Sequence, residues 1–201
     1  MIYEQGRHIL DLVNDILDFA KIQAGHMDYY IEEHPLKPLL EEVTSAYKGM
    51  ADPRGIEVRC EPVPENLVCY FDDLRLNQVL SNVINNSIKY NRDHGQVRIW
   101  AESEDTLVKI FVRDTGHGIP PDQLEKVFNE FETLGQVSLH HKGTGLGMPI
   151  SRRLMEGMGG HLHVKSEVSK GSTFWVEIPK QKILADHLYR PRPKLDGDLA
   201  A

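Results

Sequence analysis

Apolar residues recur at intervals of three and four along several stretches of the chain, and this spacing indicates amphipathic helices. The first stretch begins almost at the first residue, and Gly25 supplies a stop signal after it. The second starts at Pro35 or Pro38, and Asp72 is suited to cap the third. The pattern predicts helices at about residues 2–24, 35–50, 73–90 and 148–158.

Short runs rich in β-branched and alternating residues, bounded by turn residues, predict strands between these helices. They cover residues 56–60, 67–71, 96–103, 107–113, 161–168 and 172–178, and the last four read as two hairpins. Residues 27–34 read as a connector. This order predicts an α+β fold, a two-layer sandwich in which helices cover one face of a mixed, mostly antiparallel sheet. One long N-terminal helix precedes it.

Composition narrows the class of protein without identifying it. The 201 residues are 40% hydrophobic and 26% charged, as in ordinary soluble globular proteins. A formal net charge of −7 gives no sign of a nucleic-acid partner. No apolar run approaches the ~18 residues that span a bilayer, and acidic residues such as Asp11 and Asp15 interrupt any signal peptide. We therefore expect a cytoplasmic location. The alternative is that the chain is the cytoplasmic part of a membrane-anchored protein.

The chain has two cysteines, Cys60 and Cys69, which lie in neighbouring predicted strands. No secretory feature accompanies them. We therefore expect reduced thiols rather than a disulfide.

Two glycine clusters at residues 114–147 carry the clearest sign of a binding site. The first reads Asp114-Thr-Gly-His-Gly, and the second reads Gly143-Thr-Gly-Leu-Gly. Glycine lets the backbone approach a ligand closely. The second cluster also leads into a predicted helix, whose N-terminal N–H groups suit a phosphate. The sequence predicts a nucleotide site in which the acid reads the base and the later glycines hold the phosphates.

The predicted helix at 73–90 offers further ligands. Asn82 and Asn86 share a face because they are four residues apart. Asparagine is a mediocre helix former, whereas its amide oxygen is a suitable ligand for Mg²⁺. Lys89, one turn further, is placed to meet a phosphate. A solvated helix face is the alternative interpretation of the same residues.

Other glycine-rich and metal sites fit this sequence less well. The P-loop pattern is absent, and the Rossmann pattern would need a glycine where Met148 stands. A Gly-x-Ser-x-Gly elbow is also missing. The histidines at 140–141 and at 161 and 163 lack a cysteine or carboxylate at ligand spacing. We expect them to be ordinary histidines.

The order of these motifs resembles the catalytic domain of bacterial sensor histidine kinases. It comprises an Asn-x-x-x-Asn helix, Asp114-x-Gly-x-Gly, a pair of phenylalanines and Gly143-Thr-Gly-Leu-Gly. That family belongs with the gyrase, heat-shock chaperone and mismatch-repair ATPases, and the resemblance implies their Bergerat-type ATP-binding fold. It covers roughly residues 35–179. Residues 1–27 resemble the second helix of the family's dimerisation and phosphoacceptor hairpin, 28–34 would be a linker, and 180–201 a poorly ordered tail.

The resemblance implies ATP and Mg²⁺ as cofactors and assigns roles to the motif residues. Asn86 would bind Mg²⁺, with Asn82 nearby and Lys89 approaching the phosphates. Asp114 would accept a hydrogen bond from the adenine amino group. The remaining contacts to the nucleotide would come from Tyr90, Gly116, Gly118, Ile119, Phe128, Phe131, Gly143, Thr144, Gly145, Leu146 and Gly147. His117 and the pair Met148-Pro149 depart from the usual family residues, and we interpret them as variation.

The implied activity is transfer of the ATP γ-phosphoryl group to a histidine on the dimerisation hairpin. The partners would be the dimerisation hairpin of the same kinase, in a homodimer, and the receiver domain of a response regulator. No nucleic-acid partner is expected. His8 is followed by Ile9-Leu10, not by the family's acid, arginine and proline, so we expect the acceptor histidine to be absent. Hydrolytic relatives carry a glutamate base near the position of Asn82, and an amide cannot replace it. A regulatory pseudokinase or adaptor, or a hydrolytic ATPase, are the alternatives.

Overall fold

The computed structural model describes residues 2–132 and 144–181. Its elements follow in the order α1 (Ile2–Gln23), β1 (Glu32–Pro35), α2 (Leu36–Ala51), β2 (Glu57–Cys60), β3 (Val68–Phe71), α3 (Asp73–Lys89), β4 (Gln96–Ser103), β5 (Leu107–Asp114), α4 (Gly147–Gly157), β6 (His161–Glu167) and β7 (Gly171–Pro179). The four predicted helices and six predicted strands are all found, within about two residues at their ends.

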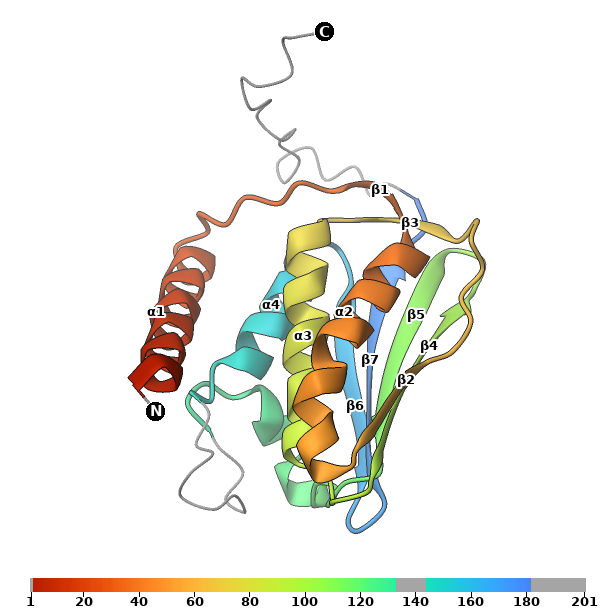
Figure 1. Cartoon of the computed structure of the whole chain (residues 1–201). Helices are drawn as coiled ribbons and strands as arrows, with labels where there is room; N and C mark the ends of the chain where they lie inside the picture. Colours follow the sequence, from red (N-terminus) through yellow and green to blue (C-terminus); the bar gives the residue numbers. More distant parts are fainter. Residues whose placement is uncertain (1, 133–143, 182–201) are drawn as a thin grey trace, which may run out of the picture.

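The larger sheet has the strand order β2-β4-β5-β7-β6. Only β2 and β4 run parallel, and the other neighbours are antiparallel. Helices α2, α3 and α4 lie on one face of this sheet, and α1 stands apart beside α4 (Figure 1). The predicted two-layer α+β architecture, with a mixed and mostly antiparallel sheet, is confirmed.

Two details of the prediction were wrong. Residues 27–34 are not only a connector, because Glu32–Pro35 form the strand β1, which pairs antiparallel with β3. This stretch has little intrinsic strand propensity, so the pairing partner decides its conformation. In addition, β2 and β3 belong to different sheets. Cys60 and Cys69 therefore do not lie on neighbouring strands of one sheet, and both are free thiols.

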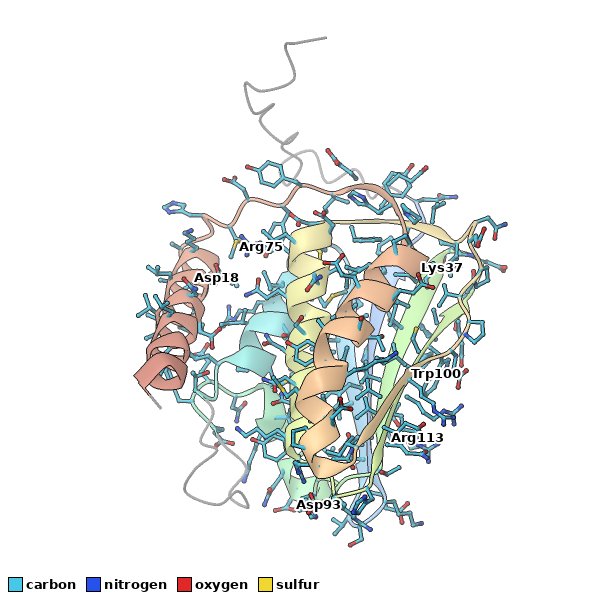
Figure 2. All side chains as sticks on the ribbon, viewed as in Figure 1. Asp18, Lys37, Arg75, Asp93, Trp100 and Arg113 are labelled. Atoms are coloured by element: carbon cyan, nitrogen blue, oxygen red, sulfur yellow. The ribbon has the colours of Figure 1, made fainter. Side chains whose placement is uncertain are left out.

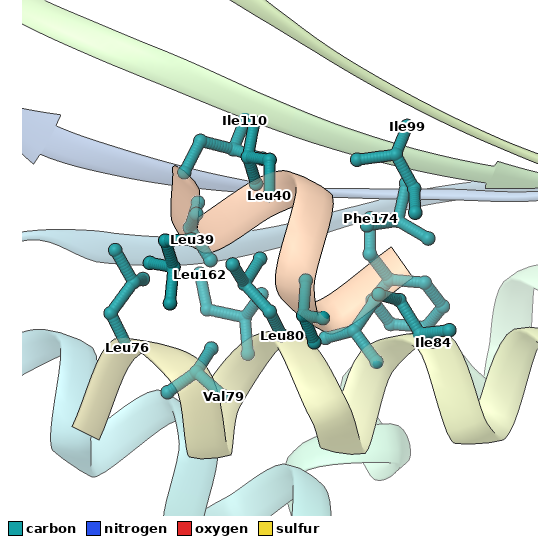
Figure 3. Close-up of a cluster of buried hydrophobic side chains, with 14 of the residues drawn as sticks. Leu39, Leu40, Leu76, Val79, Leu80, Ile84, Ile99, Ile110, Leu162 and Phe174 are labelled. Carbon is teal, nitrogen blue, oxygen red and sulfur yellow. The ribbon is translucent and has the colours of Figure 1, made fainter. Parts of the chain in front are cut away.

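The core lies between the helices and the inner face of the sheet. Alternate residues of β4 and β5, such as Ile99 and Ile110, are fully buried against helix residues such as Leu80 and Ile84. Figure 3 shows these side chains meeting between α2, α3 and the strands. Period-two alternation in the strands thus leaves every second residue of the sheet on the face without helices.

Local signals set the helix ends. The Asp72 side chain accepts a hydrogen bond from the Arg75 N–H at 3.1 Å and caps α3. Gly25 follows α1 with φ of 68°, a left-handed conformation that favours glycine. Within the described residues, none of the helices has the length and apolar character needed to cross a bilayer.

Candidate functional site

Asp114 ends β5 on the inner face of the sheet, and its side chain is only 5% exposed. Its Oδ1 atom accepts hydrogen bonds from the N–H groups of Gly116 at 2.8 Å and Ser172 at 3.1 Å. Burial raises the pKa of this carboxyl to about 6, although the two amide donors favour the charged form. Both of these hydrogen bonds go to Oδ1.

The first glycine cluster brings this carboxyl against the end of α3. A Cβ atom at Gly116 would lie 2.4 Å from the Tyr90 carbonyl oxygen and 2.8 Å from Asp114 Oδ1. At Gly118, with φ of 72°, it would lie 2.1 Å from the Glu167 carbonyl oxygen. Only glycine fits at either position without moving backbone. Ile119 follows, and its N–H donates to Ser166 Oγ at 2.8 Å.

Two residues that sequence reasoning left without a role also hold this arrangement. Asn91 is fully buried, donates to the Gln96 carbonyl at 3.0 Å and accepts from the Thr115 hydroxyl at 3.3 Å. It thereby joins the end of α3 to β4 and to the loop after Asp114. Ser172 contributes its backbone N–H to Asp114. The backbone N–H of Ser172 cannot be recognised as a donor from the sequence. The position of Asn91 just after a predicted helix is visible in the sequence and could have suggested a structural role.

Three predicted site residues lie at the C-terminal end of α3. The amide of Asn86 is half-buried and has no hydrogen-bond partner among the residues that the structure describes. Burial lowers the pKa of Lys89, whose Nζ lies 5.2 Å from the centroid of the Tyr90 ring. Burial also raises the pKa of the Tyr90 hydroxyl. The partly desolvated ammonium of Lys89 and the amide of Asn86 therefore lie one turn apart on α3.

Asn82 lies on the same face of α3, but its amide is already engaged. Its Nδ2 donates to the Gly147 carbonyl at 3.2 Å and to Ser151 Oγ at 3.1 Å. Ser151 in turn donates to the Gly147 carbonyl at 2.8 Å. Asn82 therefore holds the N-terminus of α4 against α3, a positioning contact that spacing along one helix could not reveal.

The second glycine cluster runs into α4. The Thr144 hydroxyl bridges the Leu146 N–H and Asp15 Oδ2 of α1, both at 3.1 Å. Gly145 has φ of 71°, and its carbonyl accepts from the Phe131 N–H at 3.1 Å. Leu146 is buried in the core. Gly143 and the histidine pair 140–141 lie outside the described residues.

The structure separates the two predicted phenylalanines. Phe128 is partly buried against the core, and the Arg152 guanidinium lies 5.1 Å from its ring centroid. Phe131 is 66% exposed and packs edge-on against Phe19 of α1, with ring centroids 6.3 Å apart. In the described conformation Phe131 therefore links the glycine loop to α1.

Helix α1 contacts the same side of the domain through polar groups. Asp18 Oδ2 accepts from Gln78 Nε2 at 2.8 Å and lies 3.5 Å from Arg75 Nη1. Both members of the ion pair are mostly buried, at 17% and 18% side-chain exposure, and they face each other across the gap between α1 and α3 (Figure 2).

The residues fit a magnesium-bound adenine nucleotide. A buried acceptor beside glycines that exclude any Cβ suits a purine with an amino group, and an amide and an ammonium on α3 suit phosphates with their metal. In the described part of the chain, no three His, Cys, Asp or Glu residues are grouped to hold a metal ion. A metal here would therefore take its ligands from Asn86, from the nucleotide and from water.

A mixed sheet with helices on one face, a buried aspartate beside close-packed glycines and an asparagine helix define a class of ATPase. The chain belongs to the family described as histidine kinase-, DNA gyrase B- and HSP90-like ATPases, which it matches over residues 71–182.

Among its relatives are sensor kinases. It is 34% identical over 201 residues to the circadian input-output histidine kinase CikA of Synechococcus elongatus, covering 98% of this chain and 26% of that protein. Identity to the signal transduction histidine-protein kinase BarA of Escherichia coli is 32%, over 88% of this chain and 20% of the relative. The chain thus spans about a quarter or less of these curated relatives.

Solved structures agree in fold. Full-length ShkA in complex with AMPPNP superposes with a TM-score of 0.77 at 32% identity, covering 90% of this chain and 38% of that one. The catalytic domain of histidine kinase ThkA superposes with a TM-score of 0.67 at 30% identity, covering 78% of this chain and 100% of the other. That second match spans the whole of the isolated ThkA catalytic domain.

Proposed function

We propose that this chain is the ATP-binding catalytic part of a sensor histidine kinase. The observation that carries this proposal is Asp114, a residue only 5% exposed whose carboxyl is held by the backbone N–H groups of Gly116 and Ser172. Asp114 would accept the adenine amino group, Asn86 would hold Mg²⁺ through its amide oxygen, and Lys89 would meet a phosphate. Mg²⁺-ATP, when bound, supplies the transferable phosphoryl group.

The chain's own residues favour phosphoryl transfer over hydrolysis. Phosphoryl transfer asks a protein mainly for positioning and charge neutralisation, and the glycine amides, Asn86 and Lys89 offer these. A hydrolase needs a base to activate water. Asn82 cannot act as one, and its amide is occupied by Gly147 and Ser151. The nucleotide analogue bound by ShkA supports ATP as the ligand here.

The exposed apolar side chains of helix α1 support a role for this helix in pairing with another helix. It packs on the domain through Phe19 and Ile22, yet other large apolar side chains remain exposed along it. These are Leu10 at 64%, Val13 at 47%, Ile16 at 49% and Leu17 at 52% exposure. Such an unpartnered stripe fits the dimerisation hairpin of a homodimeric kinase. The structure of ThkA in complex with response regulator TrrA supports a receiver domain as the downstream partner.

Two measurements test this function. Calorimetry with ATP and ADP, with and without Mg²⁺, is expected to show micromolar-to-millimolar binding that Mg²⁺ strengthens for ATP. A separately supplied hairpin carrying the acceptor histidine is then expected to become phosphorylated from labelled ATP. Steady phosphate release without any hairpin would favour a hydrolytic ATPase instead. ATP binding with no transfer to any hairpin would favour an adaptor, and no nucleotide binding by folded protein would remove the proposal.

A further inference from the structure

The face of the large sheet that carries no helix holds a row of four rings. Trp100 of β4, Phe111 of β5, Trp175 of β7 and His163 of β6 lie directly opposite one another across the strands. Their centroids are 4.8, 6.1 and 5.0 Å apart, with interplanar angles of 7°, 27° and 19°. The rings of this ring row therefore cover one another's faces and turn their edges outward.

A row of cations runs beside the rings, two residues along each strand. Arg59, Arg98 and Arg113 are consecutive cross-strand partners, and Lys165 follows after Thr173. Figure 2 shows Trp100 and Arg113 on the side away from the helices. All four cations of this basic row are exposed. Like charges directly opposite each other destabilise a sheet. A row of four cations is therefore easier to explain by a binding role than by its contribution to stability.

Carboxylates of the same face neutralise only part of the basic row. Arg59 pairs with Glu57 and Arg98 with Glu61. Arg113 and Lys165 have no carboxylate partner among the residues that the structure describes. The half of the row on β5 and β6, where Arg113 follows Phe111 and Lys165 follows His163, therefore has positive charge available to bind another molecule.

We propose that this face docks an acidic segment of a partner protein. Its carboxylates would meet Arg113 and Lys165, and its aliphatic side chains would lie along the ring row. The ring edges carry the positive part of the aromatic quadrupole, and both indole N–H groups already donate to carboxylates of this chain, Trp100 to Glu102 and Trp175 to Glu177. Arginine and tryptophan are also the residues that most often dominate binding energy at protein interfaces. Charge complementarity thus identifies the partner's chemistry.

Two other classes of partner fit the same face less well. Stacking of nucleic-acid bases needs free ring faces, whereas these rings cover each other. Insertion into a lipid surface needs projecting apolar side chains. Within the described ranges, none of the large apolar side chains that are exposed lies on β2, β4, β5, β6 or β7.

Tryptophan fluorescence reports on this surface, because the chain's two tryptophans are both in the ring row. The probe is a peptide of about a dozen alternating glutamate and leucine residues, and glutamine replaces glutamate in the control peptide. We expect a saturable change in tryptophan emission of the full chain with the acidic peptide only. It should weaken at high salt, since exposed charges are screened, and should not depend on ATP.

A matched pair of variants tests the assignment of residues. Arg113→Gln with Lys165→Gln is expected to weaken binding of the acidic peptide about tenfold. Lys21→Gln with Lys48→Gln removes the same charge from exposed helix positions and is expected to bind as the parent does. Urea unfolding of each variant establishes that it is folded.

Several results would overturn the proposal. They are equal binding of the glutamine peptide, unchanged affinity of the Arg113/Lys165 variant, or tighter binding of oligothymidylate or phosphatidylserine vesicles. A concentration-dependent dimer that shields both tryptophans, seen by sedimentation without peptide binding, would assign the face to a second copy of the chain and likewise overturn it.

Discussion

Replacing Asp114 by asparagine should stabilise the empty protein while impairing its site. The pKa of Asp114 is raised to about 6 from the usual 3.8, chiefly by burial. The folded carboxyl therefore keeps its proton up to about pH 6, whereas the unfolded one releases it near pH 4. Raising the pH through this window favours the unfolded state, and one pKa unit corresponds to 1.36 kcal/mol. The charged carboxylate thus costs the empty fold about 3 kcal/mol at pH 8.

Asparagine keeps an oxygen for the N–H groups of Gly116 and Ser172 but carries no charge. The free energy of unfolding of Asp114→Asn, relative to the parent, is therefore expected to rise from near zero at pH 4 to about 3 kcal/mol at pH 8. Urea unfolding followed by circular dichroism, without nucleotide, measures it at each pH. Asp122→Asn, at an exposed position, controls for the loss of one negative charge.

The same variant tests the proposed recognition of adenine. The amide would turn a donor toward the adenine amino group, so the preference for ATP over GTP is expected to fall about ten- to a hundredfold. Saturating ATP should then stabilise the parent more than the variant. A stability difference that is flat between pH 4 and pH 8, or that decreases with pH, would refute the assignment of a buried, costly carboxylate.

Three further substitutions probe other parts of the site. Asn86→Ala is expected to reduce the affinity for ATP at least about tenfold with Mg²⁺ but little without it; calorimetry showing equal losses would exclude a metal role. Gly116→Ala places a Cβ 2.4 Å from the Tyr90 carbonyl and should lower the free energy of unfolding by about 1–3 kcal/mol. Gly49→Ala, with nothing within 4 Å, should not. Asp18→Ala removes the α1 partner of Arg75 and Gln78, which stay hydrogen-bonded to each other on α3. It is expected to loosen α1 by about 1 kcal/mol, visible as faster amide exchange in α1 while α3 stays protected.

Periodicity and end signals were sufficient to predict the four α-helices and six of the seven described strands. The Asp72 cap and the stop at Gly25 act over a few residues, so they can be read locally. Strand β1 was missed because its four residues, Glu32–Pro35, have little propensity of their own. The separation of β2 from β3 was missed for a related reason, since pairing depends on which strands the helices bring together.

For the site, motif order predicted which residues would take part, and the tertiary structure decided what several of them contact. Asn82 and Asn86 look equivalent on one helix face, yet only Asn82 is engaged by α4. Phe128 and Phe131 look like a pair, yet one is partly buried and the other faces α1.

The sequence by itself predicted the four α-helices, six of the strands, the two glycine clusters and Asp114 as the candidate carboxyl of the site. Only the tertiary structure decided how deeply Asp114 is buried and which backbone amides meet it. It alone also decided that four rings and four cations from five strands form two rows on one face. The physical reason is range: propensity, capping and periodicity act between near neighbours in the chain. Desolvation and cross-strand contact instead act between residues that are far apart in the chain, such as the cross-strand partners Leu107 and Pro179, about 70 positions apart.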